Sequence, residues 1–279
     1  MYKYITLNKI PYVKHNGYAF NLFPQNGDIN IERPINILFL RYISKFDEIN
    51  YSEWYYVIKD KIEDINSYSS KVKNQIKNGL NNCSIKQEYD VNKIYSIYSN
   101  VNSTYKNKVL SFKKFKNYFD IYLNIKEFKI NYWLISINDT PIGYSKVCIS
   151  KEKVAFYEEI HIIKAYKKNY VNYALIHIMN KYYLNECQLN FVTDGSRNIY
   201  HPTQVQDFLI YKFQFRKAFC KLHVKYNFTA KIAILFLSPF YNHLKKIKGH
   251  FFYKILTLLY QDKISKANYI ILPEIRTTG

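Results

Sequence analysis

The sequence predicts an α/β protein whose mixed, largely antiparallel central sheet is flanked by helices. Three observations predict it. The chain has 279 residues, of which 48% are hydrophobic, enough for a substantial core in one large or two small domains. Segments with apolar residues at every second position alternate with segments whose apolar residues recur every three or four. Three strand-like segments also follow one another directly over residues 132–162, so we expect a contiguous antiparallel sheet there.

Residues 1–66 are expected to form a small N-terminal α/β subdomain. The segments NGYAFNLF, INILFLRYIS and EWYYVIKD predict strands, and NGD at residues 26–28 predicts a turn. The next segment, SYSSKVKNQIKNGL, begins with serines suited to an N-cap and carries Val72, Ile76 and Leu80 at helical spacing. It predicts a basic amphipathic helix that breaks near Gly79.

Residues 67–228 are expected to form the main domain, with elements in the order β, α, α, β, β, β, α, β, α, β. The predicted strands are CSIKQ, NYWLISIND, IGYSKVCIS, KVAFYEEIHIIK, QLNFVTDG and RKAFCKLHVKY. The predicted helices are VNKIYSIYSNV, FKKFKNYFDIYL, VNYALIHIMNKYYL and QVQDFLIYKF. In DTPIG, Asp139 and Pro141 suit a hairpin turn. Residues 229–279 predict a helical C-terminal extension.

Composition narrows the class of protein. The start of the chain has no apolar leader, and no apolar run approaches the roughly 20 residues of a membrane span, so we expect a soluble, cytoplasmic protein. Four scattered cysteines without a CxxC pair predict neither a disulfide framework nor a metal site.

The chain carries 41 Lys+Arg against 21 Asp+Glu, a net charge of +20. Such a charge is typical of a protein that binds a polyanion, but the abundance of Lys, Asn, Ile and Tyr also fits the coding bias of an AT-rich genome. The two explanations stay open, although the nearly neutral first 60 residues show that the charge is not spread evenly.

The order of elements, together with the step FQFRKAF at residues 213–219, resembles the GNAT superfamily of N-acyltransferases. In that family the helix before the last strand ends in a phenylalanine preceded by glycine, and here Gln214 stands in the place of the glycine. SSKVKNQIKNGLNNCSI and DGSRNIYHPTQVQDFLIYKFQFRKAFCKL are similar to segments of Fem-type aminoacyl transferases and of GNAT-like proteins from bacterial surface-polysaccharide gene clusters. The resemblance covers most of residues 50–226. It implies an enzyme that transfers an acyl group from acetyl-CoA or another acyl-CoA to an amine.

The resemblance places catalysis on the strand FYEEIHI. Side-chain alternation puts Tyr157, Glu159 and His161 on one face and Glu158 on the other. Because the family uses a residue of this strand, often glutamate, to remove the proton of the amine, we expect Glu159 to be the base and His161 its partner or substitute. Glu158 is the other candidate carboxylate. In the competing interpretation, these carboxylates only pair with nearby lysines.

The donor site departs from the family. Typical members hold the pyrophosphate of coenzyme A on a glycine-rich turn before the next helix, but the turn IKAYKKNYVNY contains no glycine. Either Lys167 and Lys168, with Tyr170, replace the glycines, or the donor is aminoacyl-tRNA, as in Fem-type enzymes. The place of the family's tyrosine acid falls on Ile210, and Tyr211 lies one residue away.

A polar cluster follows the strand QLNFVTDG, where α/β sheets commonly open their ligand crevices. We expect it to bind the acceptor or the donor, although each of its members alone also suits a turn or a helix cap. Its members are Asp194, Arg197, His201, Gln204 and Asp207.

The resulting hypothesis is an N-acyltransferase without a metal cofactor that acts on a small-molecule or lipid-linked amine, such as an amino sugar of a surface polysaccharide. Aminoacyl transfer from tRNA is the first alternative. The second is a catalytically inactive protein that binds nucleic acid or a membrane through its basic surface. The lysine-rich helices of residues 229–279 either touch the inner face of the membrane peripherally or simply cover a core.

Overall fold

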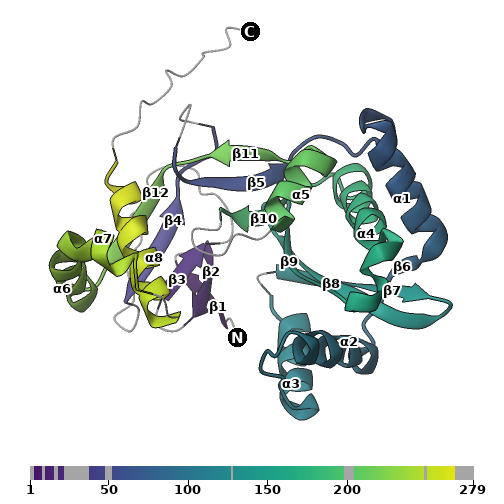
Figure 1. Ribbon diagram of the computed structural model, residues 1–279, viewed down its shortest axis with the longest axis horizontal. Helices are drawn as coiled ribbons and strands as arrows, with labels where there is room; N and C mark the ends of the chain where they lie inside the picture. Colours follow the sequence, from purple (N-terminus) through teal and green to yellow (C-terminus); the bar gives the residue numbers. More distant parts are fainter. Residues whose placement is uncertain are drawn as a thin grey trace, which may run out of the picture. The chain divides into compact units, whose positions relative to one another are not determined.

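A computed structural model describes residues 3–7, 10–15, 18–21, 38–47, 52–126, 128–197, 204–247 and 250–267 (Figure 1). The chain divides into two compact units. Unit 1 comprises Met1–Val57, Ser196–Gln204 and Lys217–Gly279, and unit 2 comprises Ile58–Gly195 and Val205–Arg216. The N-terminal and C-terminal segments of the chain therefore belong largely to the same unit.

The main sheet is mixed but mainly antiparallel, which confirms the expected fold class. Its strand order is β11-β5-β10-β9-β8-β7-β6. The pairs β6/β7, β7/β8 and β8/β9 are antiparallel, and β9 and β10 are parallel. The contiguous antiparallel sheet expected over residues 132–162 is therefore present. The strands are β5 (Tyr55–Lys59), β6 (Ser84–Gln87), β7 (Phe128–Ile137), β8 (Thr140–Ser150), β9 (Val154–Ile162), β10 (Phe191–Ser196) and β11 (Arg216–Phe219).

The turn between β7 and β8 consists of two residues. Asn138 and Asp139 both have positive φ, 46° and 60°, as in the two-residue hairpin turns whose twist matches that of the flanking strands. The prediction that Pro141 lies in the turn is wrong, since this residue lies in β8 and its register partner is Ser136.

Helices cover both faces of the sheet (Figure 1). On one face α2 (Val91–Thr104) packs against β8 and β9, and α3 (Phe112–Leu123) packs against β7. On the other face α1 (Ser70–Asn82) packs against α4 (Val171–Asn180), and Asn180 accepts a hydrogen bond from Tyr157 of β9. Helix α2 buries Ile94, Ile97 and Val101 of its predicted apolar stripe. Helix α1 buries Val72 and Ile76, but Leu80, expected on the same stripe, is exposed.

Helix α1 begins where expected but ends later. The side chain of Ser69 accepts a hydrogen bond from the backbone N–H of Val72 and caps the first turn. The predicted break at Gly79 is wrong, because the helix continues to Asn82. A Cβ atom at Gly79 would lie 2.5 Å from the carbonyl oxygen of Tyr170 and 3.0 Å from Cβ of Ala174. The glycine therefore allows α1 to approach α4 closely instead of ending the helix.

The segment after α4 keeps helical form with a wider turn. Residues Lys181–Glu186 form a π-helix, which buries Tyr183. The hydroxyl of Tyr183 accepts hydrogen bonds from Trp133 (2.8 Å) and Asn131 (3.2 Å) of β7. Such π-segments are rare and are frequent at functional sites.

The step from α5 (Gln204–Phe213) into β11 is abrupt, as the sequence predicts, because Gln214 takes the left-handed conformation with φ 57°. Its side chain explains why glutamine stands there. Nε2 donates to the carbonyl of Ser67 (2.8 Å), and Oε1 accepts from the hydroxyl of Ser67 (3.2 Å). These bonds offset the strain that a non-glycine residue carries in this conformation.

The segment RKAFCKLHVKY was expected to be a single strand, and this expectation is wrong. It forms β11 and then β12 (Leu222–Tyr226), which belong to different sheets. Between them the N–H of Cys220 donates to the carbonyl of Trp54, and the N–H of Lys221 donates to the hydroxyl of Ser44. Partners outside the segment therefore divide it.

Unit 1 contains a five-stranded sheet of order β1-β2-β3-β4-β12, in which β12 pairs antiparallel with β4. Its other strands are β1 (Lys3–Leu7), β2 (Ile10–His15), β3 (Tyr18–Asn21) and β4 (Phe39–Ile43), and its helices are α6 (Phe228–Leu237), α7 (Tyr241–Leu244) and α8 (His250–Ser265). The turn expected at residues 26–28 lies outside the described residues. Among the helices of the described segments, none is long and apolar enough to cross a membrane.

Candidate active site

A β-bulge at Glu158 decides which side chains β9 presents to each face of the sheet. On β8, Lys146 pairs with Glu159, whereas the residue after Lys146 pairs with Tyr157. Glu158 is therefore the extra residue of the bulge, and Tyr157 and Glu159 lie on opposite faces. The expectation that Tyr157 shares a face with Glu159 and His161 is wrong, because the bulge interrupts the alternation. Glu159 and His161 do share a face, since the strand is regular after the bulge.

The bulge brings two carboxylates to one buried lysine. Nζ of Lys146 lies 2.7 Å from Oε1 of Glu159 and 3.3 Å from Oε2 of Glu158. The side chain of Lys146 is only 3% exposed, and Nζ also lies 4.4 Å from the ring centroid of Tyr122 in α3. The pairing of these carboxylates with a lysine, which the sequence left open, is thus present.

His161 and Glu159 form the accessible part of this cluster. Nε2 of His161 lies 3.6 Å from Oε2 of Glu159, and the side chains are 22% and 34% exposed. The hydroxyl of Tyr144 donates to Glu159 (3.0 Å), and the ring of Tyr144 stacks on the imidazole at a centroid distance of 5.0 Å. The imidazole is therefore held in place on one side and reachable by solvent.

Lys146 and Glu159 keep each other ionised through their opposite charges. Burial lowers the pKa of Lys146, but the carboxylates of Glu159 and Glu158 outweigh it and raise this pKa well above its usual range. Burial likewise raises the pKa of Glu159, but Lys146 and His161 outweigh it and hold this pKa well below its usual range. A carboxylate with so low a pKa is a weak base, whereas an imidazole oriented by such a carboxylate suits proton transfer.

These groups lie beyond the point where β9 stops pairing with β10. The parallel pairing joins residues 154–156 to residues 191–193. Glu158 follows this paired stretch on β9, and Asp194 follows it on β10. The next residue on β10 is Gly195, whose φ is 89° and where a Cβ atom would lie 2.9 Å from the ring of Phe156. Glycine is therefore required at this end of β10 both by its conformation and by its neighbour.

Asp194 is a second group that suits proton transfer. Burial raises its pKa to about 7, and a hydrogen bond with Gln206 offsets only part of this rise. A carboxyl group that titrates near neutral pH can accept or release a proton under physiological conditions.

The turn before α4 carries the residues expected to bind the donor. Residues Lys164–Asn169 form a 3-10 helix, and Tyr170 follows with φ 56°, in the left-handed conformation for which glycine is the usual choice. Nζ of Lys167 donates to the hydroxyl of Tyr105 in a 3.0 Å hydrogen bond, and Lys168 is exposed. With Lys164, three cations are therefore present in this turn.

The other polar residues expected to form a cluster are divided between the two units. Asp194 and Asp207 belong to unit 2, Arg197 and Gln204 belong to unit 1, and His201 lies outside the described residues. Asp207 is exposed in the first turn of α5, where a carboxylate favours the helix dipole.

Arg197 has partners within unit 1. Nη1 donates to the carbonyl of Glu53 (2.6 Å), and the guanidinium lies 5.5 Å from the ring centroid of Tyr55 and 5.8 Å from that of Tyr260. These contacts hold the guanidinium in place, and its predicted role in binding the acceptor or the donor stays a prediction.

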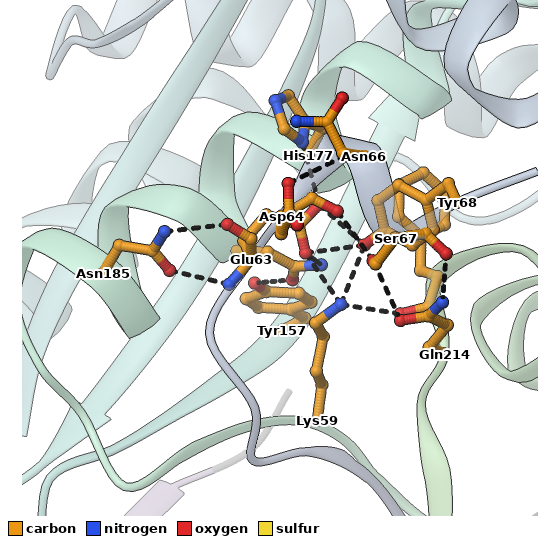
Figure 2. Close-up of polar contacts among 12 residues, drawn as sticks. Lys59, Glu63, Asp64, Asn66, Ser67, Tyr68, Tyr157, His177, Asn185 and Gln214 are labelled. Atoms are coloured by element: carbon orange, nitrogen blue, oxygen red, sulfur yellow. Dashed lines mark hydrogen bonds and ion pairs between the residues drawn. The ribbon is translucent and has the colours of Figure 1, made fainter.

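Unit 2 also contains a buried polar network that the sequence did not predict (Figure 2). The side chain of Glu63 is fully buried, and its carboxylate accepts hydrogen bonds from Lys59 (2.8 Å), the hydroxyl of Tyr68 (2.6 Å) and Asn180 (3.3 Å). Nδ1 of His177 lies 2.8 Å from the same carboxylate. Together these groups hold the pKa of Glu63 below its usual range although burial acts to raise it.

The rest of this network ties the loop after β5 to α4 and the π-helix. Nζ of Lys59 also donates to Tyr68 (2.8 Å) and to the carbonyl of Phe213 (3.0 Å). The side chain of Asn185 bonds to both backbone polar groups of Glu63. The only signal in the sequence is a lysine at the end of the otherwise apolar strand YYVIK, because Glu63 and His177 are 114 positions apart.

Among the described residues there is no group of three or more His, Cys, Asp or Glu side chains that could hold a metal ion.

No family model matches the chain, and no curated protein matches its sequence. Among solved structures, the chain is similar to the C-terminal domain of a putative lysylphosphatidylglycerol synthetase from Agrobacterium fabrum, with a TM-score of 0.52 and 8% identity over 84% of this chain and 86% of that one. L-PGS from Bacillus licheniformis gives a TM-score of 0.48 at 9% identity, over 95% and 90% of the two chains. FemX gives a TM-score of 0.46 at 8% identity over 62% of this chain. The chain spans only 61% of the FemX chain.

At this identity the likeness to the Agrobacterium domain shows a common fold. The chain has a mixed α/β fold with a mainly antiparallel central sheet flanked by helices.

Proposed function

We propose that this protein is an acyltransferase that passes an acyl group directly to an amine at the bulge of β9. The observation that carries the proposal is the accessible pair Glu159 and His161, which lies beside the bulge and beyond the end of the β9/β10 pairing. The ammonium form of an amine must lose a proton before its nitrogen can attack an acyl carbon, and a positioned imidazole is the commonest group for that task.

In this mechanism His161 accepts the proton of the attacking amine. Glu159 orients the ring and stabilises the imidazolium, and Lys146 keeps Glu159 ionised throughout. His161 thus takes the role of substitute base that the sequence left open, because Lys146 holds the pKa of Glu159 low. Glu158 is buried against Lys146 and acts on the lysine instead of on the substrate.

The acyl group is polarised and its leaving group protonated by other parts of the same strands. The extra residue of a bulge leaves a backbone N–H outside the regular ladder, and such a group can donate to the oxyanion of the tetrahedral intermediate. As the N–C bond forms and the bond from carbon to the donor's sulfur or oxygen breaks, Asp194 gives its proton to the leaving group. Its pKa of about 7 suits that step.

The donor is an acyl-CoA such as acetyl-CoA, whose phosphates lie against Lys167, Lys168 and Tyr170 in the turn before α4. The acceptor is a small-molecule or lipid-linked amine, for example an amino sugar of a surface-polysaccharide precursor. Coenzyme A esters are made in the cytoplasm, so the reaction takes place there or at the inner face of the membrane.

Aminoacyl-tRNA is the second candidate donor, and the turn before α4 favours it. Tyr170 occupies the left-handed position in place of glycine, and its carbonyl packs against Gly79 of α1. This turn lacks the glycines through which backbone N–H groups converge on a pyrophosphate. The Agrobacterium chain is, by its printed name, the C-terminal domain of a putative lysylphosphatidylglycerol synthetase, which fits an aminoacyl group and a lipid-linked acceptor.

The donor is identified by incubating the full-length protein with acetyl-CoA or with bulk aminoacyl-tRNA, each with and without a mixture of amino sugars. Release of free thiol or of deacylated tRNA is followed. We expect His161→Gln to lower the rate about 100-fold or more, whereas His243→Gln, at an exposed histidine of α7, has no effect.

If the protein turns over one of the two compounds and not the other, that compound is the donor. Turnover of neither donor, with no rise in melting temperature from either, contradicts acyl transfer. The protein would then be a catalytically inactive protein that binds nucleic acid, and the exposed or half-buried lysines of α1 would carry its function. Charge reversal at Lys73 and Lys77 would abolish nucleic-acid binding in that case, while His161→Gln would change nothing.

A further inference from the structure

Helix α6 of unit 1 exposes an apolar stripe. Phe228, Ile232, Leu235 and Phe236 follow the spacing i, i+4, i+7 and i+8, which places them on one side of the helix. Three of them, the two phenylalanines and Leu235, are between 68% and 76% exposed, and Phe240 just after the helix is 58% exposed. A contiguous exposed apolar surface of this kind marks an interaction site in a folded protein.

The stripe is separate from the face with which α6 joins unit 1. The residues that α6 buries are Ala230 and Ile234, which lie on the opposite side of the helix. The helix is also well capped, because Asn227 accepts from the N–H of Ala230 (2.8 Å) and Ser238 donates to the carbonyl of Ile234 (2.6 Å). The helix is thus anchored through one face and presents a second apolar face outward.

The segment that carries the stripe is rich in positive charge. Residues 217–267 contain ten lysines and a single acidic residue, Asp262, and Asp262 is paired with Lys266 at 2.7 Å. Lys231 lies on α6 beside the stripe, and Lys231, Lys245 and Lys246 are exposed. An apolar stripe flanked by lysines is complementary to a bilayer that contains anionic lipids, because the side chains enter the acyl region while the lysines meet the headgroups.

A pocket of about 960 Å³ lies next to the stripe, lined by residues of β4, β12, α6 and α8. One wall is formed by Tyr42 and the ring of His223 stacked on it at a centroid distance of 4.9 Å. Lys225, Lys231 and Lys266 contribute positive charge to the lining, and one carboxylate, that of Asp262, lies there too, paired with Lys266. Lys225 and Lys231 therefore remain in excess of the negative charge, and Leu235 belongs to both the lining and the stripe. An anionic group attached to an apolar chain matches this combination.

We propose that α6 lies on an anionic phospholipid bilayer through Phe228, Ile232, Leu235, Phe236 and Phe240, and that the adjacent pocket holds the phosphate headgroup of one lipid. Both features belong to unit 1, whereas the proposed acyl-transfer residues belong to unit 2. The inference therefore does not depend on the acyl-transfer proposal.

Vesicle co-sedimentation of the full-length protein tests the bilayer contact. Phosphatidylcholine vesicles with about 30 mol% phosphatidylserine are compared with phosphatidylcholine alone, at about 0.1 M and about 0.5 M salt. We expect binding only to the anionic vesicles and weaker binding at high salt. Because the stripe is exposed, Leu235→Ser with Phe236→Ser leaves the protein folded and lowers vesicle affinity about tenfold or more.

Matched substitutions of equally exposed apolar residues in unit 2 serve as controls. Ile62 and Tyr211 are 73% and 78% exposed, and Ile62→Ser with Tyr211→Ser leaves vesicle binding unchanged. Equal binding of the stripe variant and the wild type, or no binding of the wild type to anionic vesicles at low salt, would overturn the bilayer contact.

Water-soluble dihexanoyl phosphatidylserine tests the pocket. It raises the melting temperature of the wild type but not that of Lys231→Glu, whereas Lys108→Glu, the same charge change at an exposed lysine of unit 2, behaves as wild type. An equal rise in all three proteins, or none in the wild type, would refute the headgroup site.

Discussion

Lys146 and Glu159 face each other across β8 and β9, with Nζ 2.7 Å from Oε1, and the same nitrogen is 3.3 Å from the carboxylate of Glu158. The lysine is buried and Glu159 is partly exposed. One cation is thus the counter-charge of two carboxylates, one of which touches the proposed base.

Replacing Lys146 by methionine leaves both carboxylates without this counter-charge. Removing one partner of a buried ion pair costs about 3 to 5 kcal/mol, and the partial exposure of Glu159 places the expected loss near the lower end. Urea unfolding at pH 7 measures it. Lys151→Met, at an exposed lysine after β8, is the control and should change the free energy of unfolding by less than about 0.5 kcal/mol.

The pH dependence of the same variant is a separate prediction. The folded protein holds the pKa of Glu159 below its usual range, so the unfolded chain binds more protons in acid. The stability that this carboxylate contributes is present above its unfolded pKa and is lost as the pH falls through its folded pKa. Between about pH 5 and pH 2, wild type should lose more stability than Lys146→Met. Parallel curves for the two proteins would contradict the pairing.

The raised pKa of Asp194 predicts the opposite dependence of stability on pH. Its folded pKa of about 7 lies above the unfolded value, so the folded protein binds the proton more tightly and loses stability as the pH rises from about 4 to about 7. Asp194→Asn should equal wild type in stability near pH 4 and exceed it by about 2 to 4 kcal/mol at pH 8. Asp207→Asn, an exposed aspartate of α5, is the control. A gain of the same size at both pH values would point to a cause other than ionisation.

The network of Figure 2 predicts a large cost for Glu63→Ala. The substitution leaves the ammonium of Lys59 buried with only neutral oxygens as partners, and we expect a loss of about 3 to 5 kcal/mol. Adding Lys59→Met should recover part of it, because the uncompensated charge is then gone. Glu186→Ala, at an exposed glutamate, is the control. Additive losses in the double variant would show that the two residues are not coupled.

Two substitutions of Gln214 distinguish the effect of backbone strain from the effect of the side-chain hydrogen bonds. Gln214→Ala keeps the left-handed conformation and loses the two bonds to Ser67, so the protein should lose about 1 to 2 kcal/mol. Gln214→Gly loses the same bonds but relieves the strain, which is worth about 1 kcal/mol, and should stay close to wild type. Thermal unfolding of the two variants side by side gives the comparison. If the glycine variant is the less stable of the two, strain is not a factor at this position.

Local patterns predicted most elements of unit 2, because their apolar spacing reflects the burial that the fold provides. The stripe of α2 and the three strands within residues 132–162 are examples. The shared face of Glu159 and His161 follows from the same period of two.

The sequence-based predictions were wrong where a distant part of the chain determines the local structure. The bulge at Glu158 depends on pairing with β8, and no residue type in FYEEIHI requires it. The role of Gly79 depends on the carbonyl of Tyr170. The network around Glu63 joins residues 114 positions apart. One-dimensional periodicity contains no information on any of these contacts.

The pairing of β4 with β12 has a consequence for the order in which the chain is made. Unit 1 takes its segments from both ends of the sequence, and a nascent chain leaves the ribosome from its N-terminus. β4 therefore emerges early, while the strand that pairs with it is translated only after the whole of Ile58–Gly195.

During that interval an edge of β4 has no strand beside it, and unpaired edges invite association with other chains. Unit 2 can begin to fold while unit 1 waits for its last segment. Premature termination before residue 222 would therefore yield products prone to aggregate, and synthesis of this protein should depend on chaperones that shield the nascent N-terminal strands.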